Sequence, residues 1–241
     1  MTEFADTNWS QAGFAKAYQD NAQYYLPERD LLLDILVSFY RRFVMTSEGA
    51  SVLDLGCGDG IVSAALIDAD PNINIQAIDG SKDMIAASRK RLSALPAERI
   101  RMVTFQDLIS ESVVLGTFDC MVSAFAIHHI DLTEKQALFR WVIRNLKSEG
   151  FFMNVDVVRP SVLDQEDWYY DLWREWIERH QQQENEAAED FRNVPSAART
   201  RPENKYDTLE EQLEALKQAG FCDVECHYRH GLFGMYSGRR P

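Results

Sequence analysis

Three alternate glycines, Gly56, Gly58 and Gly60, follow a short apolar segment, 52–55, which contains the acidic residue Asp54. Glycine lets the backbone turn sharply and approach a ligand at a point where a Cβ atom would collide. The apolar segment predicts a buried strand, and helix-forming residues resume directly after the glycines. A strand, a glycine turn and a helix N-terminus with unpaired N–H groups together predict a binding site for a nucleoside cofactor.

The spacing of the glycines separates two kinds of cofactor loop. A dinucleotide fingerprint has glycine at its first, third and sixth positions, and the sixth position counted from Gly56 is Ile61. The sequence also lacks a GxxxxGK[ST] phosphate loop. The pattern resembles motif I of the class I S-adenosylmethionine (SAM) dependent methyltransferases, an apolar strand with Asp or Glu followed by GxGxG. This resemblance implies SAM as cofactor and S-adenosylhomocysteine as product, with Asp54, Gly56, Cys57 and Gly58 at the cofactor.

A second polar group follows the strand predicted over residues 73–79. Asp79 ends this strand about 20 residues after the glycine loop, where a carboxylate accepts two hydrogen bonds from a ribose diol. The resemblance implies that Asp79, with Gly80 and Ser81 beside it, lies at the ribose and that Met84 packs on the adenine. The alternatives are that Asp79 caps the next helix, which is compatible with ribose binding, and that Met84 fills the core.

Two further strand ends complete the expected cofactor site. Residues 100–107 predict a third strand. The resemblance implies that Asp107 accepts from the adenine amino group and that the N–H of Leu108 reaches a ring nitrogen; a turn-forming aspartate is the alternative. The fourth strand ends at Ser123 and Ala124. There the resemblance implies that backbone carbonyls near Ala124 and in the glycine loop accept from the cofactor's ammonium group.

The sequence SAFAIHH, 123–129, resembles the fourth motif of methyltransferases that act on small molecules. A sulfonium methyl is a strong electrophile, so the protein mainly has to align the nucleophile and exclude water, and a general base is optional. His128 is the best candidate for such a base, because it follows a strand end and an imidazole has a pKa near neutrality. His129 and Asp156 are the next candidates. The alternative for each is hydrogen bonding to the backbone alone.

The order of the predicted elements indicates the fold. Apolar strands alternate with helices, which indicates a doubly wound, mostly parallel sheet. The resemblance implies a Rossmann-like, seven-stranded α/β sheet with a C-terminal antiparallel hairpin and a helical lid. We expect residues 49–159 to form the SAM-binding core and residues 206–241 to complete it. Residues 1–48 are expected to be an N-terminal helical cover, and residues 160–205 a helical insertion that covers the substrate.

Two helix starts carry the spacing of a capping box. In each, a threonine hydroxyl lies three residues before a side chain that can cap in return. The pairs are Thr133 with Gln136 and Thr208 with Glu211. The second of these helices is expected to end at Gly220.

Both segments outside the predicted sheet are rich in aromatic residues. We expect Trp9 and Tyr18 from the N-terminal segment, and Trp168, Tyr169 and Trp173 from the insertion, to line the pocket of the methyl acceptor. The alternative is that these rings pack on the sheet or form a dimer contact.

Composition narrows the kinds of partner. The 241 residues carry a net charge of −13 without an evident basic stripe, which disfavours a nucleic acid substrate. The four cysteines have no zinc-binding spacing, and no carboxylate cluster suggests a magnesium site, so no metal is expected. No apolar run approaches the roughly 20 residues of a membrane span, and the N-terminus lacks a signal peptide pattern, so a cytoplasmic protein without membrane contact is expected.

The sequence thus predicts a methyltransferase that moves the SAM methyl group to oxygen, nitrogen or carbon of a small metabolite by in-line displacement, as a monomer or homodimer. A tRNA-modifying enzyme, a carboxy-SAM related enzyme of the same fold, and a SAM-binding sensor or partner subunit without catalysis are the alternatives.

Overall fold

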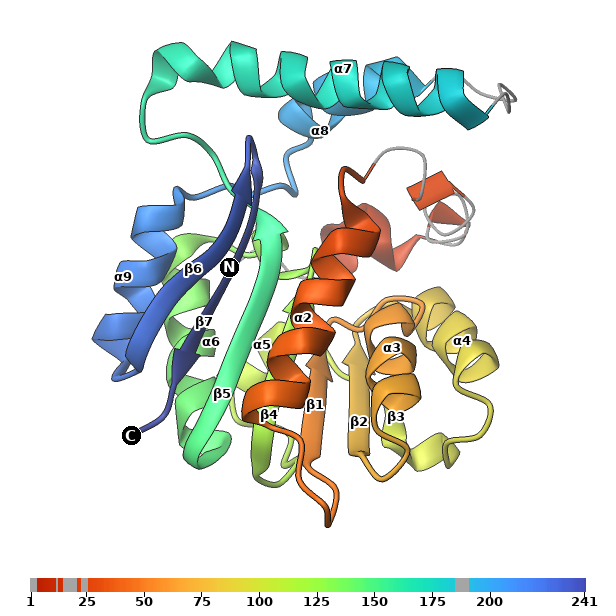
Figure 1. Ribbon diagram of the computed structural model, residues 1–241, viewed down its shortest axis with the longest axis vertical. Helices are drawn as coiled ribbons and strands as arrows, with labels where there is room; N and C mark the ends of the chain where they lie inside the picture. Colours follow the sequence, from red (N-terminus) through yellow and green to blue (C-terminus); the bar gives the residue numbers. More distant parts are fainter. Residues whose placement is uncertain (1–3, 12, 15–20, 23–25, 185–190) are drawn as a thin grey trace.

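The strands form one seven-stranded sheet in the computed structural model, which describes residues 4–11, 13–14, 21–22, 26–184 and 191–241. Their order is β3-β2-β1-β4-β5-β7-β6 (Figure 1). The bounds are β1 Ser51–Leu55, β2 Asn74–Asp79, β3 Ile100–Met102, β4 Phe118–Ala124, β5 Leu146–Val157, β6 Cys222–His230 and β7 Phe233–Arg239. Strands β1 to β5 are parallel, β7 is antiparallel to β5, and β6 is antiparallel to β7. The predicted Rossmann-like sheet with its C-terminal hairpin is confirmed.

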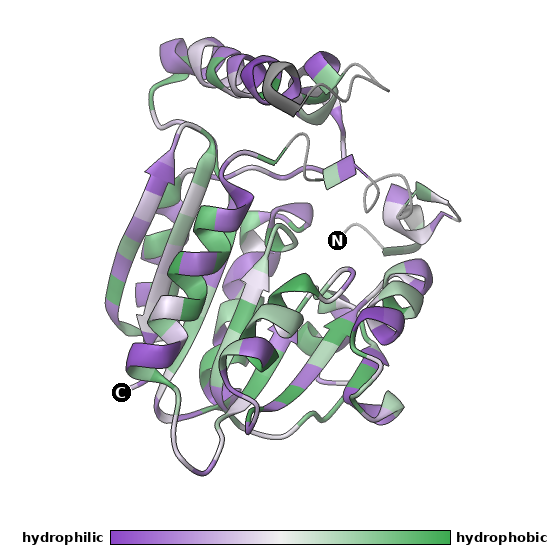
Figure 2. Cartoon of the chain, turned by 45° about the vertical axis from the view of Figure 1, so that its right-hand side comes forward, coloured by the Kyte–Doolittle hydropathy of each residue, from purple (hydrophilic) through white to green (hydrophobic). Residues whose placement is uncertain are grey.

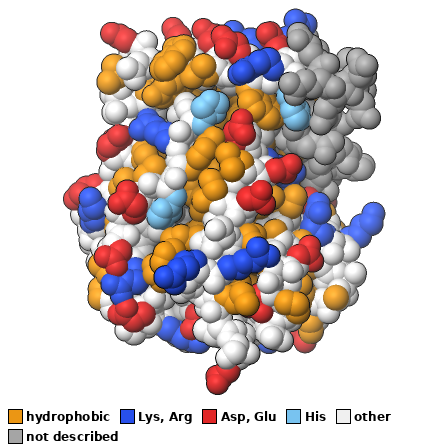
Figure 3. Space-filling model, in the orientation of Figure 1, with side chains coloured by type: hydrophobic (Ala, Val, Ile, Leu, Met, Phe, Trp, Pro, Cys, Tyr) orange, Lys and Arg blue, Asp and Glu red, His pale blue; other side chains and the backbone are white. Residues whose placement is uncertain are grey.

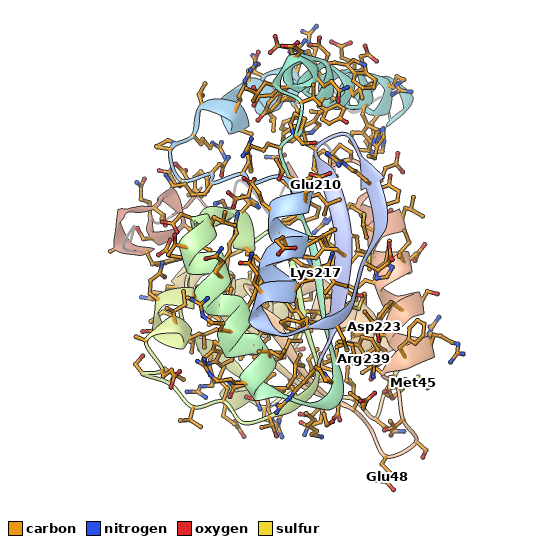
Figure 4. The ribbon with its side chains drawn as sticks, turned by 90° about the vertical axis from the view of Figure 1, so that its left-hand side faces the viewer. Met45, Glu48, Glu210, Lys217, Asp223 and Arg239 are labelled. Atoms are coloured by element: carbon orange, nitrogen blue, oxygen red, sulfur yellow. The ribbon has the colours of Figure 1, made fainter. Side chains whose placement is uncertain are left out.

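Helices cover both faces of this sheet. Their bounds are α2 Arg29–Phe43, α3 Ile61–Ala69, α4 Lys82–Arg91, α5 Phe105–Ile109, α6 Leu132–Asn145, α7 Glu166–Glu184, α8 Val194–Thr200 and α9 Leu209–Ala219. In Figure 4, α6 and α9 lie side by side on one face and α2 lies on the other. The buried residues agree, since Leu138 and Leu216 belong to one apolar cluster and Leu36 and Leu66 to another.

The alternation of side chains along the strands explains why both faces need helices. Consecutive residues point to opposite faces of a strand, so Val52 contributes to the cluster under α2 and α3, whereas Leu53 contributes to the cluster under α6 and α9. Both are fully buried. Figure 2 shows hydrophobic segments in the central strands and both hydrophobic and hydrophilic segments in the helices around them. A strand that is apolar on both sides is thereby removed from water.

The two capping boxes predicted from the sequence have different outcomes in the structure. Thr208 and Glu211 exchange the predicted pair of hydrogen bonds at the start of α9, which ends at Gly220 with a φ of 105°. Helix α6 instead uses Asp131, whose Oδ1 accepts the N–H of Glu134 at 2.9 Å, while Glu134 Oε2 accepts the N–H of Asp131 at 3.1 Å. The prediction of Thr133 and Gln136 is wrong, because Asp131 holds the extended N-cap backbone and Thr133 already lies inside the helix.

Helix α7 crosses the molecule beyond the carboxyl end of β5, with α8 beside it (Figure 1). Its inner residues Tyr170, Trp173 and Ile177 are buried with Phe233 of β7 in a third apolar cluster. The rings of Trp173 and Phe233 meet edge to face, with centroids 5.1 Å apart. Within the described ranges, no helix combines the length and apolarity that crossing a bilayer requires.

The two capping boxes generate a stability prediction. We expect Thr208→Ala to lower the free energy of unfolding by about 1 kcal/mol, because it removes the hydroxyl that accepts the N–H of Glu211. Thr133→Ala is the matched control and is expected to change it by less than about 0.5 kcal/mol, since Thr133 is exposed and caps nothing. Urea unfolding followed by circular dichroism measures both. Equal losses in the two variants would contradict the assignment of the caps.

Candidate functional site

A first cavity lies at the carboxyl ends of β1, β2 and β4, where a doubly wound sheet binds its ligand. The following residues predicted from the sequence line it: Trp9, Asp54, Gly56, Cys57, Gly58, Asp79, Gly80, Met84, Ala124 and His129. Residues that the sequence analysis did not single out also line it, among them Arg29, Asp59, Phe105, Gln106 and Phe125. The structure therefore brings most of the predicted cofactor residues to one place.

The glycine loop after β1 requires glycine at Gly56. A Cβ atom there would lie 2.4 Å from the Cβ of Ala126, and the φ of 67° falls in the left-handed region. The N–H of Gly58 donates to Asp79 Oδ2 at 2.9 Å, which ties the loop to the end of β2. The loop is thus held between the ends of β2 and β4, with its backbone bordering the cavity.

Asp79 is a half-buried carboxylate that holds two backbone N–H groups. Its Oδ2 accepts from Gly58, and its Oδ1 accepts from Ser81 at 2.7 Å. Burial raises the pKa of this carboxyl group to about 6, although the two N–H groups lower it. A carboxylate has about four lone-pair sites, so Asp79 retains acceptor capacity toward the cavity. The structure does not bring Ser81 to the cavity, because its buried hydroxyl caps α4 by accepting the N–H of Met84.

Asp54 presents a buried carboxylate oxygen without a hydrogen-bond partner among the described residues. Its Oδ2 accepts from Ser63 Oγ at 2.6 Å, whereas its Oδ1 has no partner there. Burial, with a smaller contribution from the carboxylate of Asp79, raises the pKa of Asp54 to about 7, although hydrogen bonds from Ser63 lower it. A cation in the cavity would stabilise the ionised form of both side chains.

Arg29, in the first turn of α2, is the only lysine or arginine among the described residues that line the first cavity. The same cavity carries Asp54, Asp59 and Asp79. Asp59 is paired with Arg91, so two carboxylates and one guanidinium are left for a ligand, which suits one with more positive than negative groups.

The third strand differs from its prediction. β3 ends at Met102, and the expected strand is wrong beyond that residue because Thr104 begins α5 with a capping box. The carboxylate of Asp107 accepts both the N–H and the hydroxyl of Thr104, each at 2.8 Å. Leu108 is fully buried in the core. Neither residue lines the cavity, whereas the preceding residue, Gln106, does.

The end of β4 turns sharply. The hydroxyl of Ser123 donates to the carbonyl of Leu55 at 2.8 Å, so it joins β4 to β1 and does not reach the cavity. Ala124 lines the cavity as expected. Phe125 follows with a φ of 54°, a strained conformation for an aromatic residue, and its N–H donates to Val155 at 2.8 Å.

A second cavity adjoins the first and lies under α7 and α8. It shares Trp9, Leu26, Phe125 and His129 with the first cavity. Its other lining residues are Phe14, Asn21, His128, Val157, Trp173, Phe191, Val194, Ala198, Arg201, Asn204 and Tyr206. Among the predicted acceptor residues, Trp9 and Trp173 line it. Trp168, which is 55% exposed, and Tyr169 do not, and Tyr18 lies outside the described residues.

His128 and Asp156 form a buried pair at the second cavity. His128 Nδ1 lies 2.5 Å from Asp156 Oδ1, and this oxygen also accepts the N–H of Val157 at 2.9 Å. The other carboxylate oxygen lies 3.4 Å from Asn154 Nδ2. An aspartate that accepts from Nδ1–H leaves the Nε2 lone pair available as a base. Asp156 itself lines neither cavity.

His129 has a different hydrogen bond. Its Nε2 accepts from Trp9 Nε1 at 2.9 Å, so that lone pair is engaged. Burial, followed by the neighbouring His128, holds the pKa of His129 well below its usual range. A neutral His129 that orients Trp9 at the border of the two cavities fits these observations better than a base. Among the described residues, no three His, Cys, Asp or Glu side chains are grouped so that they could hold a metal ion.

Comparisons with known proteins give a family match over part of the chain. Residues 52–150 match the family described as a methyltransferase domain. Carboxy-S-adenosyl-L-methionine synthase of Histophilus somni is 22% identical over 222 residues, which are 91% of this chain and 88% of that protein. Ribosomal RNA small subunit methyltransferase C of Salmonella newport is 34% identical over 120 residues, 47% of this chain and 34% of that protein. The chain thus spans only about a third of the RNA methyltransferase.

Solved structures share the fold. PigF with SAH has a TM-score of 0.61 and 16% identity over 95% of this chain and 60% of that chain. An O-methyltransferase family protein from Burkholderia thailandensis has a TM-score of 0.65 and 14% identity over 98% of this chain and 62% of that chain. This chain therefore spans about three fifths of the length of both proteins. The shared fold, the matched methyltransferase domain and the glycine loop are together consistent with the class I SAM-dependent methyltransferase superfamily, whose cofactor is SAM.

Proposed function

We propose that this protein transfers the methyl group of SAM to a small molecule bound in the second cavity. The observation that carries this proposal is the joining of two cavities through Phe125 and His129, with the cofactor residues in the first and the His128–Asp156 pair at the second. A small acceptor in the second cavity would meet the methyl group where the cavities join.

The first cavity fits the chemical groups of SAM. Asp79 would accept from the ribose hydroxyls. The unpartnered Oδ1 of Asp54, with backbone carbonyls near Gly56 and Ala124, would face the ammonium group. The guanidinium of Arg29 would bind the carboxylate of the cofactor.

The adenine end of the cofactor would lie toward Met84 and Gln106, which line the same cavity. Met84 offers a polarizable thioether to the ring face. Gln106 offers amide groups to the ring edge. We assign this position to Gln106 in place of Asp107, because the carboxylate of Asp107 is engaged by the capping box with Thr104.

When bound, SAM supplies an electrophilic methyl group on a sulfonium. The residues of this chain hold the acceptor in line with it and keep water out, which the aromatic lining of the second cavity favours. A nucleophile of the acceptor would take this methyl group, and the sulfur would leave with the electron pair of the carbon–sulfur bond as S-adenosylhomocysteine. His128 Nε2 takes the proton of the acceptor, and Asp156 stabilises the resulting imidazolium through Nδ1–H.

Carboxy-SAM chemistry is a second candidate, because the alignment with the carboxy-SAM synthase spans nearly the whole of both chains. Modification of RNA has less support. The net charge is −13, and on the face shown in Figure 3 lysine and arginine side chains are interspersed with aspartate and glutamate. A SAM-binding protein without catalysis remains the third candidate, and turnover separates it from the other two.

A base at the second cavity gives a test of the proposed function. We expect the protein to release S-adenosylhomocysteine with at least one acceptor from a panel of small phenols, amines and carboxylic acids. The rate of release should fall about 100- to 10,000-fold in His128→Asn, because asparagine cannot take the proton. His230→Asn, which changes a histidine that lines neither cavity, is the control. Mass spectrometry of products identifies a methylated acceptor. If the product is carboxy-SAM, the second candidate function replaces the proposal. If SAM binds but no acceptor is turned over, the protein is a SAM-binding protein without catalysis.

The close contact at Gly56 predicts a specific loss of cofactor binding. We expect Gly56→Ala to weaken SAM binding by about tenfold to a hundredfold, because the new methyl group would displace the loop from Ala126. Gly116→Ala is the matched control. Gly116 also has a positive φ, 101°, but a Cβ atom there meets nothing within 4 Å, so only local strain is added. Isothermal titration calorimetry with SAM measures both, and similar affinities in the two variants would refute the role of this contact.

Burial of the two aspartates predicts how SAM binding depends on pH. The pKa values of Asp54 and Asp79 are raised to about 7 and about 6, and a cationic ligand prefers both side chains ionised. The affinity for SAM is therefore expected to fall as the pH is lowered through about 7 and again through about 6. Asp54→Asn should remove the upper step. Titrations at constant ionic strength would show this, and an affinity independent of pH over that range would argue against these carboxylates as ligands.

A further inference from the structure

The segment after α8 supplies a polar wall to the second cavity. Arg201, Asn204 and Tyr206 all line the cavity from this segment. Other residues of the lining are apolar or aromatic, among them Phe125 and Trp173. A ligand in this cavity would thus meet both aromatic rings and hydrogen-bond donors.

Arg201 has no acidic partner within ion-pair distance in the described part of the chain. Its recorded neighbour is the ring of Phe14, 5.5 Å from the guanidinium carbon. Arg199, two residues earlier, behaves differently and pairs with Glu166 and Asp167, each at 2.7 Å. In a chain with 38 acidic and 25 basic residues, an arginine that faces a cavity without a carboxylate has its fork of donors available for an anion.

Tyr206 adds a second donor. Its hydroxyl oxygen accepts from Asn204 Nδ2 at 2.7 Å, and the described residues offer no acceptor for its proton. Asn204 Nδ2 also donates to the carbonyl of Ala198 at 2.8 Å, which fixes the segment to α8. Burial raises the pKa of Tyr206, so the phenol stays protonated and able to donate. The hydroxyl is therefore oriented by Asn204 and left to donate to a ligand.

We propose that the second cavity takes an acceptor that carries a carboxylate, bound by the guanidinium of Arg201 and the hydroxyl of Tyr206. This inference rests on the proposed function and names the class of its substrate. The carboxylate would lie against the polar wall, the apolar body would pack on Phe125 and Trp173, and the nucleophilic atom would face His128. One guanidinium and one neutral donor match a single negative charge better than the two charges of a phosphate monoester.

Matched pairs of acids and amides test this proposal without any need for turnover. The probes are benzoate and benzamide, phenylacetate and phenylacetamide, and hexanoate and hexanamide, each titrated in the presence of S-adenosylhomocysteine. Fluorescence of Trp9 and Trp173, which line the cavity, reports binding. We expect at least one acid to bind about tenfold more tightly than its amide, since the acid gains a charge-assisted hydrogen bond.

Substitutions then assign the preference to its residues. Arg201→Gln should abolish the preference for the acid, and Tyr206→Phe should reduce it, while affinity for the amide stays the same. The control is Arg174→Gln, which removes an equal charge from a surface pair with Asp171 on the same lid and should leave the preference intact. Inorganic phosphate, titrated alongside, should not compete at equal concentration. The proposal would be overturned if the amide bound as tightly as the acid in every pair, or if no acid bound at millimolar concentration. It would also be overturned if Arg201→Gln kept the preference for acids, or if phosphate competed effectively.

The proposed function can fail independently of this inference. If acids are preferred through Arg201 but no acceptor leads to S-adenosylhomocysteine release, the anion site is supported and methyl transfer is refuted. If neutral acceptors are methylated at a rate that Arg201→Gln does not change, the proposed function is supported and the anion site is refuted.

Discussion

The site depends on carboxylates near the ends of strands, each held in place by hydrogen bonds within the protein. Asp79 holds the N–H groups of Gly58 and Ser81, and Asp54 holds the hydroxyl of Ser63. Asp156 holds the N–H of Val157 and the imidazole of His128. Each internal bond fixes the direction of the carboxylate, so that no reorganisation is needed when a ligand arrives. Burying an ionised carboxylate costs free energy, because the charge loses its hydration. The pKa values of Asp54 and Asp79 are raised for this reason before a cation is bound.

Two segments outside the parallel sheet add walls to the cavities at this strand edge. Helix α7 packs Trp173 against Phe233 of β7, and near the N-terminus Trp9 donates to His129. The second link explains why two adjacent histidines differ. His129 is neutral and orients an indole, whereas His128 is held by Asp156 and faces the second cavity. Neighbours in sequence thus acquire separate roles because each is bonded to a distant element.

The parts of this architecture that depend on local patterns could be predicted from the sequence. The glycine loop, the strand alternation and the cap at Thr208 are of this kind, since spacing alone determines them. Asp107 was misplaced although a local signal existed, because Thr104 and Asp107 have capping-box spacing that competes with an extended strand. Aromatic residues occur on several faces of α7, so the sequence does not indicate which face is buried. In the structure Tyr170 and Trp173 are buried, whereas Trp168 is exposed.

Arg29, Arg201 and Tyr206 belong to no motif, and only long-range packing brings them to the cavities. Their placement gives the two cavities opposite electrostatic character: the first is lined by three aspartates and Arg29, whereas the second is lined by Arg201, which has no acidic partner among the described residues. An anionic acceptor beside a sulfonium gains Coulomb attraction, which is strong where water is excluded. Methyl transfer removes the positive charge from sulfur and therefore removes that attraction. The same charge pair that draws the two substrates together would thus cease to hold the products, which favours their release after each transfer.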